Sequence, residues 1–173
     1  MAQPVPKFYY QQMMKAKSDE IAVDNFWANT LAHYFTQEKF YGIEREQSPL
    51  EGVHKRVNIT IRYIKDSKKP KRVVLIENKK KGYENQESKW VEAKTQLTKY
   101  LKLARADQFD RADNQITLYG IVGIGQYVRF YSFSPGEQEM DAFPSSAIDV
   151  YDIRKDDDKV HAILNKIVKD TFK

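Results

Sequence analysis

A glutamate and a lysine, Glu77 and Lys79, stand two residues apart at the end of an apolar run in this 173-residue chain. Side chains two apart on a β-strand project from the same face, so the carboxylate and the ammonium group are expected side by side. Burying a carboxylate is costly unless a positive charge pairs with it, and a metal ion or an ammonium group can do so. The pair therefore indicates either a small reactive site or an ordinary ion pair at the end of a strand.

The E-x-K spacing by itself is weak evidence, because it occurs three times in this lysine-rich chain. The copies at Glu87–Lys89 and Glu92–Lys94 fall in a segment with helical spacing of apolar residues, where they are expected to face solvent. Only Glu77-Asn78-Lys79 follows the run Val73 to Ile76, which is typical of a strand buried on both faces.

A strand is also predicted before this run, because apolar and polar residues alternate from Val57 to Ile64. The charged, proline-bearing stretch from 65 to 71 is expected to be a hairpin loop, which would place Asn58 on the strand beside Glu77. A helix is predicted from about 87 to 105. On it, Gln96 and Tyr100 are four residues apart and share one face. Taken alone, they would be a surface glutamine and a half-buried tyrosine.

The remaining chain completes one domain, 1–173, since its length allows one core of ordinary size. A loose N-terminal arm is expected over 1–14, and a C-terminal extension with a final helix over 136–173. The other predicted elements are a helix from Ser18 to about Phe40, strands over 41–47, 116–124 and 127–133, and a final helix near 157–168. Gly125-Gln126 is a plausible two-residue turn between the last two strands.

Asn58 on one strand, Glu77-Asn78-Lys79 on the next and Gln96-x-x-x-Tyr100 on the following helix resemble the PD-(D/E)XK nuclease superfamily. The closest pattern is that of its RecB-like branch, which carries Q-x-x-x-Y on the helix after E-x-K. The resemblance covers roughly residues 18 to 133. It implies an α/β fold with a restriction-endonuclease-like αβββαβ core, in which helices flank a mixed central sheet.

The resemblance also implies the chemistry of metal-dependent phosphodiester hydrolysis. Oxygen ligands would hold Mg²⁺ or Mn²⁺, with Glu77 as a metal ligand and Lys79 as the catalytic cation. In such enzymes an acid often lies on the first helix, and Glu20 is the first candidate by its position, in competition with Asp24 and Glu38.

Asn58 departs from the pattern, because it occupies the position of a metal-binding aspartate. A neutral amide offers a carbonyl oxygen but lacks the negative charge that binds a hard cation well. Three interpretations are open: a substitution introduced to trap an inactive state, a natural loss of cutting with retained binding, or a shifted site that uses another acid.

Positive charge is concentrated around this motif. Residues 54 to 105 hold 16 Lys and Arg against 5 Asp and Glu, a net +11, whereas the whole chain carries +5. Such a segment favours polyanions such as nucleic acid through phosphate contacts. The expected partner is nucleic acid, with DNA preferred over RNA. The expected phosphate-binding residues are Lys80, Lys81, Lys94 and Lys99. The same lysines are also consistent with a solvated surface or, at Lys79 to Lys81, a nuclear-import patch.

Composition excludes several classes of protein. Cys is absent, which rules out disulfides and thiolate chemistry, and three scattered His disfavour a His-only metal site. No apolar run approaches the roughly 20 residues of a membrane-spanning helix, so no membrane partner is expected. The protein is expected to be intracellular, in the cytoplasm or the nucleus. A homodimer would allow both strands of a duplex to be cut.

The sequence therefore predicts a nuclease or its inactivated form. The alternative is a non-catalytic module of the same fold that binds nucleic acid or a protein. A scaffold with no role in nucleic-acid binding is the third option.

Overall fold

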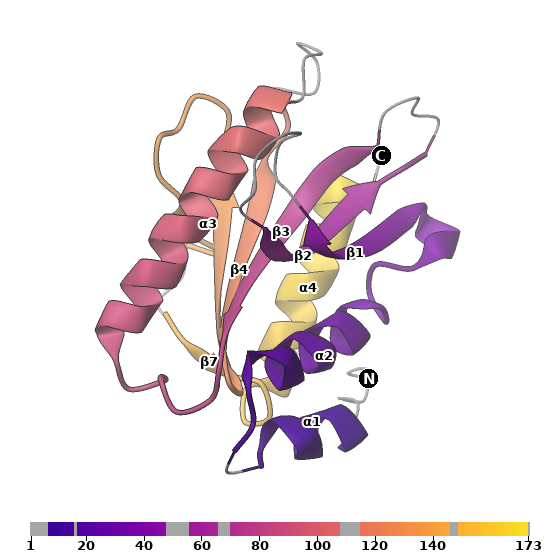
Figure 1. The fold of residues 1–173 in the computed structure, drawn as a ribbon. Coiled ribbons are helices and arrows are strands. Elements are labelled where there is room, and N and C mark those ends of the chain that lie inside the picture. The colour runs from indigo at the N-terminus through magenta and orange to yellow at the C-terminus, as the bar shows by residue number, and fades with distance from the viewer. Residues whose placement is uncertain are drawn as a thin grey trace.

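The structure, a computed structural model, describes residues 7–15, 17–47, 56–65, 70–107, 115–145 and 149–172. Its helices cover both faces of a mixed β-sheet (Figure 1). The helices are α1 (Lys7–Met13), α2 (Glu20–Leu31), the 3₁₀ turn η1 (Gln37–Lys39), α3 (Glu87–Asp107) and α4 (Asp157–Thr171). The strands are β1 (Tyr41–Gln47), β2 (Val57–Tyr63), β3 (Lys71–Lys79), β4 (Leu118–Ile124), β5 (Tyr127–Phe133), β6 (Asp141–Ala142) and β7 (Tyr151–Asp152).

The strand order across the sheet is β1-β2-β3-β4-β5-β6, and β7 pairs with β5 beside β6. β3 and β4 are parallel, while the other neighbouring pairs are antiparallel. A parallel pair needs a crossover connection, which α3 provides between β3 and β4. The mixed α/β architecture and the order of the core elements agree with the prediction.

The two faces of the sheet carry separate apolar cores. α3 covers one face, where Trp90, Leu97 and Leu101 share an apolar core with Leu75 of β3 and Val122 of β4. α2 and α4 cover the other face, where Trp27 and Leu164 belong to the larger core (Figure 1). β3 lies between the two layers and is buried from Arg72 to Asn78, as its continuous apolar run predicted.

The first long helix is shorter than the sequence indicated. It begins after Asp19, whose side chain caps it by accepting a 3.0 Å hydrogen bond from the Ala22 N–H, and it ends at Leu31. Tyr34 and Phe35 continue the apolar pattern and are buried, but they lie in a turn. Phe40 then takes a left-handed conformation with φ 61° and leads into β1. The helical spacing of apolar residues therefore extended past the end of α2, which is why the sequence predicted a longer helix.

The expected N-terminal arm contains α1 within its described part. Met13 is fully buried, and the Tyr10 hydroxyl donates a 2.9 Å hydrogen bond to Gln126 Oε1 in the turn between β4 and β5. The Tyr10 ring also packs edge-on against Phe26 of α2. These contacts pack the described part of the expected arm, α1, against α2 and the turn between β4 and β5.

Most other boundaries agree with the prediction to within three residues. β1 and β5 have the predicted bounds, and Gly125 takes φ 55° in the predicted turn between β4 and β5. The C-terminal extension ends in α4 as expected but also adds β6 and β7. None of the described helices is both long and apolar enough to cross a membrane.

Candidate active site at the end of strand β3

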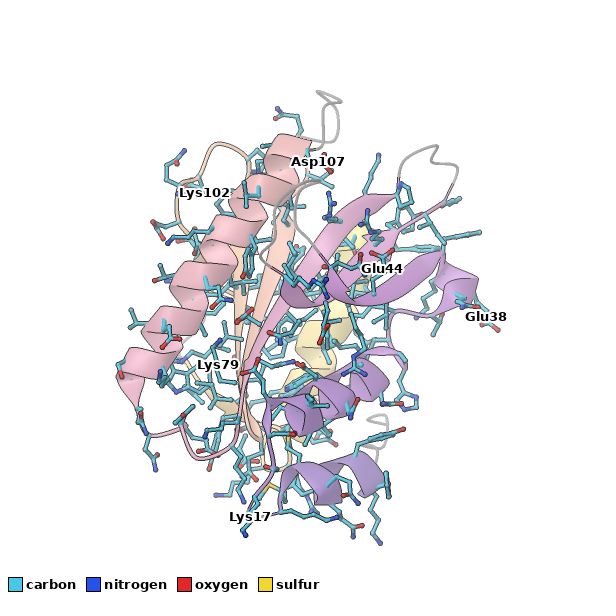
Figure 2. All side chains as sticks on the ribbon, in the orientation of Figure 1. Lys17, Glu38, Glu44, Lys79, Lys102 and Asp107 are labelled. Carbon is cyan, nitrogen blue, oxygen red and sulfur yellow. The ribbon has the colours of Figure 1, made fainter. Side chains whose placement is uncertain are left out.

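Glu77 and Lys79 project from the same face of β3, as their spacing predicted. Lys79 Nζ donates a 2.7 Å hydrogen bond to Glu77 Oε1, and the two side chains form an ion pair. The Glu77 side chain is only 2% exposed, and its second oxygen, Oε2, is buried without a hydrogen-bond partner among the described residues. Figure 2 shows Lys79 between α3 and α2. One oxygen of a buried carboxylate is thus left unsatisfied beside a lysine.

The surroundings raise the pKa values of both Glu77 and Lys79. Burial raises the pKa of Glu77 to about 7, despite the hydrogen bond and the charge of Lys79, which lower it; the charges of Glu20 and Asp24 raise it further. Burial alone would lower the pKa of Lys79, but the hydrogen bond and the charge of Glu77 raise it above its ordinary value. Lys79 is therefore held as a cation, which suits it to stabilise negative charge rather than to accept a proton.

Asn58 lies on β2, the strand next to β3. The last residue pair between these two strands at this end is Ile59 with Ile76, and Asn58 directly precedes Ile59. Its amide nitrogen, Nδ2, is 3.2 Å from Glu20 Oε1 and 3.2 Å from Asp24 Oδ2. Its oxygen accepts a 3.0 Å hydrogen bond from the main-chain N–H of Asn78. The amide therefore bridges two carboxylates of α2 and fastens them to the end of β3.

Of the three acids proposed on the first helix, two reach this cluster. Glu20 and Asp24 are one helical turn apart on α2, and both accept from Asn58. Glu38 lies outside α2, on the exposed turn η1, and Figure 2 shows it at the outer edge of the molecule, away from Lys79. The sequence therefore located the helix but could not choose between Glu20 and Asp24.

Asp24 is the more buried of the two, with 5% exposure. Its Oδ1 accepts a 2.7 Å hydrogen bond from Asn78 Nδ2, while its Oδ2 accepts from Asn58. Burial is the main influence and raises the pKa of Asp24, whereas the two amide hydrogen bonds and the charge of Arg45 lower it and the charge of Glu20 raises it. Asn78 is a member of the site that sequence reasoning missed. The only signal was a polar residue inside an apolar strand, facing away from Glu77 and Lys79.

Gln96 and Tyr100 meet on α3 as their four-residue spacing predicted. Gln96 Nε2 donates a 2.8 Å hydrogen bond to the Tyr100 hydroxyl, and Tyr100 is 3% exposed. Burial raises the pKa of Tyr100, its hydrogen bond with Gln96 lowers it, and the charges of Glu77 and Lys79 act on it in opposite directions. A cavity of about 590 Å³ runs beside these side chains and is also lined by Lys99.

The four predicted phosphate-binding lysines differ in their exposure and in their contacts. Lys99 is exposed in the cavity beside Tyr100, and Lys80 is exposed with its ammonium group 4.9 Å from the Tyr83 ring. Lys94 is partly buried, with its ammonium group 5.2 Å from the Tyr131 ring on β5. Lys81 donates a 2.9 Å hydrogen bond to the Met14 carbonyl oxygen, beside α1. Lys94 and Lys81 thus have structural contacts that the sequence did not reveal.

The donor chemistry of the cluster suits a hard cation, because Glu20, Asp24 and Glu77 offer carboxylate oxygens and Glu77 Oε2 has no described partner. The carboxylate oxygens of these residues do not surround one common point. Within the described ranges, no three His, Cys, Asp or Glu side chains are placed to hold one metal ion. The Asn58 amide occupies the position between Glu20 and Asp24.

The sequence matches no family model, and neither a curated protein nor a solved structure matches the chain.

Proposed function

We propose that this chain carries a PD-(D/E)XK-type site for hydrolysing phosphodiester bonds of nucleic acid, DNA in preference to RNA, with cutting weakened by Asn58. The observation that supports this most is the ion pair between Lys79 and the buried Glu77 at the end of β3, where the charges of Glu20 and Asp24 also act on Glu77 and raise its pKa. The arrangement of β2, β3, α3 and β4 is compatible with a restriction-endonuclease-like core. The net +11 of residues 54 to 105 favours a polyanionic substrate.

Glu77 and a carboxylate of α2 would hold Mg²⁺ or Mn²⁺, which when bound supplies positive charge beside the scissile phosphate and favours ionisation of the attacking water. Lys79, held as a cation by Glu77, would stabilise the negative charge that develops on the phosphate. Tyr100 and Gln96 lie beside the cavity along α3 and would orient the nucleic acid next to Lys79.

Asn58 explains why cutting should be weak. Its amide nitrogen lies 3.2 Å from an oxygen of Glu20 and from an oxygen of Asp24, where its partly positive hydrogens compensate both carboxylates. A cation between these acids would compete with the amide. An aspartate at position 58 would remove the amide and add a charge that attracts the cation.

The same contact supports the second candidate function, a non-catalytic module that binds nucleic acid. Because the Asn58 amide satisfies Glu20 and Asp24, this part of the site holds together without a metal ion. Binding would then depend on exposed cations such as Lys80 and Lys99.

Cleavage assays on four forms of the full chain separate the two candidates. These forms are the unmodified chain, Asn58→Asp, Asn58→Asp with Glu77→Ala, and Asn58→Asp with Lys79→Ala. Each is incubated with labelled single- and double-stranded DNA and RNA in the presence of Mg²⁺ or Mn²⁺. We expect Asn58→Asp to cut faster than the unmodified chain, and either second substitution to reduce that rate by about a hundredfold or more.

Two results would change the assignment. If Asn58→Asp binds nucleic acid but cuts none of the substrates, the binding module is the better description. Strong cutting by the unmodified chain that survives Glu77→Ala would place the reaction centre elsewhere.

A further inference from the structure

Asn78 is the middle residue of Glu77-Asn78-Lys79, and it faces the opposite side of β3 from its two neighbours. It is fully buried, with 0% exposure, in a strand that is otherwise apolar from Val73 to Ile76. Its Nδ2 donates a 2.7 Å hydrogen bond to Asp24 Oδ1, and its main-chain N–H donates to Asn58 Oδ1. Burying an amide is costly unless its polar atoms are paired. Nδ2 has Asp24 as its partner, whereas Oδ1 is buried without a hydrogen-bond partner among the described residues.

The two asparagines hold Asp24 from both sides. Asn78 donates to Oδ1 and Asn58 donates to Oδ2, so each oxygen of the carboxylate has its own amide donor. Neutral donors fix the orientation of the carboxylate but leave its charge in place. Two hydrogen bonds on different oxygens also prevent the side chain from rotating freely about its terminal bond.

Gly123 provides the space that this arrangement needs. It lies directly beside Asn78 on the parallel strand β4. A Cβ atom added to Gly123 would come within 2.5 Å of Asn78 Oδ1 and 2.7 Å of Trp27 Nε1. Its φ angle is not in the left-handed region, so the glycine is required by the close approach of these side chains and not by the backbone conformation.

Trp27 forms the remaining wall of this space. It follows Asp24 by three residues on α2, is fully buried and packs edge-on against Phe26. Because the indole ring occupies the space above Gly123, it limits where the Asn78 amide can lie. A side chain at position 123 would push Asn78 or Trp27 away, and α2 with Asp24 would shift relative to β3.

We propose that Asn78 and Gly123 are positioning residues, which set the carboxylate of Asp24 against the end of β3. This inference rests on the proposed function for its consequence, since Asp24 is one of the acids that would hold the metal ion. Asn78 acts through Asp24 and does not itself contact the reacting atoms. Its role therefore differs from those of Glu77 and Lys79, which project from the other face of the strand.

The contact itself is tested in the unmodified chain by hydrogen exchange of the Asn78 side-chain amide, followed in ¹⁵N-correlated NMR spectra. We expect slow exchange, which Asp24→Ala should accelerate. Glu20→Ala is the matched control, because it removes the neighbouring carboxylate that Asn58 contacts and Asn78 does not. Exchange that is equally fast with and without Asp24 would overturn the proposal.

The consequence is tested with Mn²⁺ alone, whose affinity is measured by electron paramagnetic resonance in the Asn58→Asp chain. Adding Asn78→Ala or Gly123→Ala should weaken Mn²⁺ binding about tenfold or more, as expected for residues that orient a ligand. Gly42→Ala is the control, since nothing lies within 4 Å of a Cβ at that position. Unchanged Mn²⁺ affinity in folded Asn78→Ala and Gly123→Ala chains would also overturn the proposal.

A further pair of variants covers the case in which Asn78→Ala does not fold. Asn78→Asp places two carboxylates together, whereas Asn78→Asp with Asp24→Asn exchanges donor and acceptor and restores the hydrogen bond. Better folding of the exchanged pair than of Asn78→Asp alone supports the contact, and equal instability contradicts it. If no form binds Mn²⁺ or cuts nucleic acid, the proposed function fails, while the exchange measurement still decides whether Asn78 holds Asp24.

Discussion

Lys79 Nζ and Glu77 Oε1 are 2.7 Å apart, and the other oxygen of the same carboxylate is buried without a described partner. This relationship leaves half of a buried carboxylate available for a cation, while the other half holds a lysine in its charged form. It also makes the stability of the protein depend on pH.

The first prediction concerns that pH dependence. Burial raises the pKa of Glu77 from an ordinary 4.5 to about 7, so between these values the folded chain binds a proton that the unfolded chain has released. The contribution of Glu77 to the free energy of unfolding is therefore fully present below pH 4.5, the pKa of glutamate in the unfolded chain, and it is lost as the pH rises towards 7. Because each pKa unit corresponds to about 1.4 kcal/mol, the loss should be about 3 to 4 kcal/mol.

Urea unfolding of the metal-free chain between pH 4.5 and 8 measures this effect. Glu77→Gln keeps an acceptor for Lys79 but cannot ionise, so its unfolding free energy should fall less over the same range and exceed that of the unmodified chain near neutral pH. Parallel pH profiles for the two proteins would show that Glu77 is not the titrating group.

The second prediction concerns Asn58→Asp in the absence and presence of a divalent cation. Without metal, the substitution removes two hydrogen-bond donors and places a third carboxylate beside Glu20 and Asp24. We expect a loss of about 1 to 3 kcal/mol in the free energy of unfolding, because the neighbouring acids lose their partner and repel the new charge.

Adding Mg²⁺ or Mn²⁺ should restore that stability, since a cation bound only by the folded state stabilises it. Thermal unfolding with increasing metal concentration measures both effects. The unmodified chain is the control and should respond little, because its amide already bridges the acids. Equal responses of the two proteins would indicate that position 58 does not face the metal ion.

The main elements could be predicted because their signals are local. The alternation from Val57, the apolar run before Glu77 and the three- and four-residue spacing from Trp90 to Leu101 placed β2, β3 and α3. Such periodicities follow directly from which side chains face the core. The four-residue separation of Gln96 and Tyr100 likewise sufficed to predict that they would meet.

Other features depended on contacts between distant segments, which no local pattern reveals. α1 is ordered by the hydrogen bond from Tyr10 to Gln126, 116 residues away. The hydrogen bond between Asn78 and Asp24 joins residues 54 apart, and the sequence suggested no role for Gly123. The charge of Lys94 was visible in the sequence, but its position over Tyr131 was not.

The third prediction concerns Gly120, which sets how closely α3 approaches β4. A Cβ at this position would lie 2.8 Å from Met140 Sδ and 3.0 Å from Leu97 Cδ2. Both neighbours are the ends of flexible side chains, so Gly120→Ala should fold but lose roughly 1 to 3 kcal/mol from overpacking. The change should also displace Gln96, which is adjacent to Leu97 on α3.

Chemical denaturation of Gly120→Ala beside Gly42→Ala measures this loss. Gly42 is also in a strand, but nothing lies within 4 Å of the point where its Cβ would be, so Gly42→Ala should be neutral or slightly stabilising. A destabilisation of the same size in both variants would point to a general effect of alanine in these strands instead of a close contact under α3.

The last prediction compares two lysines of α3 that the sequence placed in the same group. Lys99 is exposed and lines the cavity beside Tyr100, whereas Lys94 lies over the Tyr131 ring on the side of β5. If nucleic acid lies along this cavity, Lys99→Gln should weaken binding and reduce the slope of log affinity against log salt by about 1. Lys94→Gln is the matched control, with the same charge change on the same helix, and should leave the slope unchanged.

Fluorescence anisotropy with a labelled single strand and a labelled duplex, at several salt concentrations, measures the affinities of both variants. A larger change for Lys94 than for Lys99 would move the nucleic acid to the β5 side of α3 and away from Glu77.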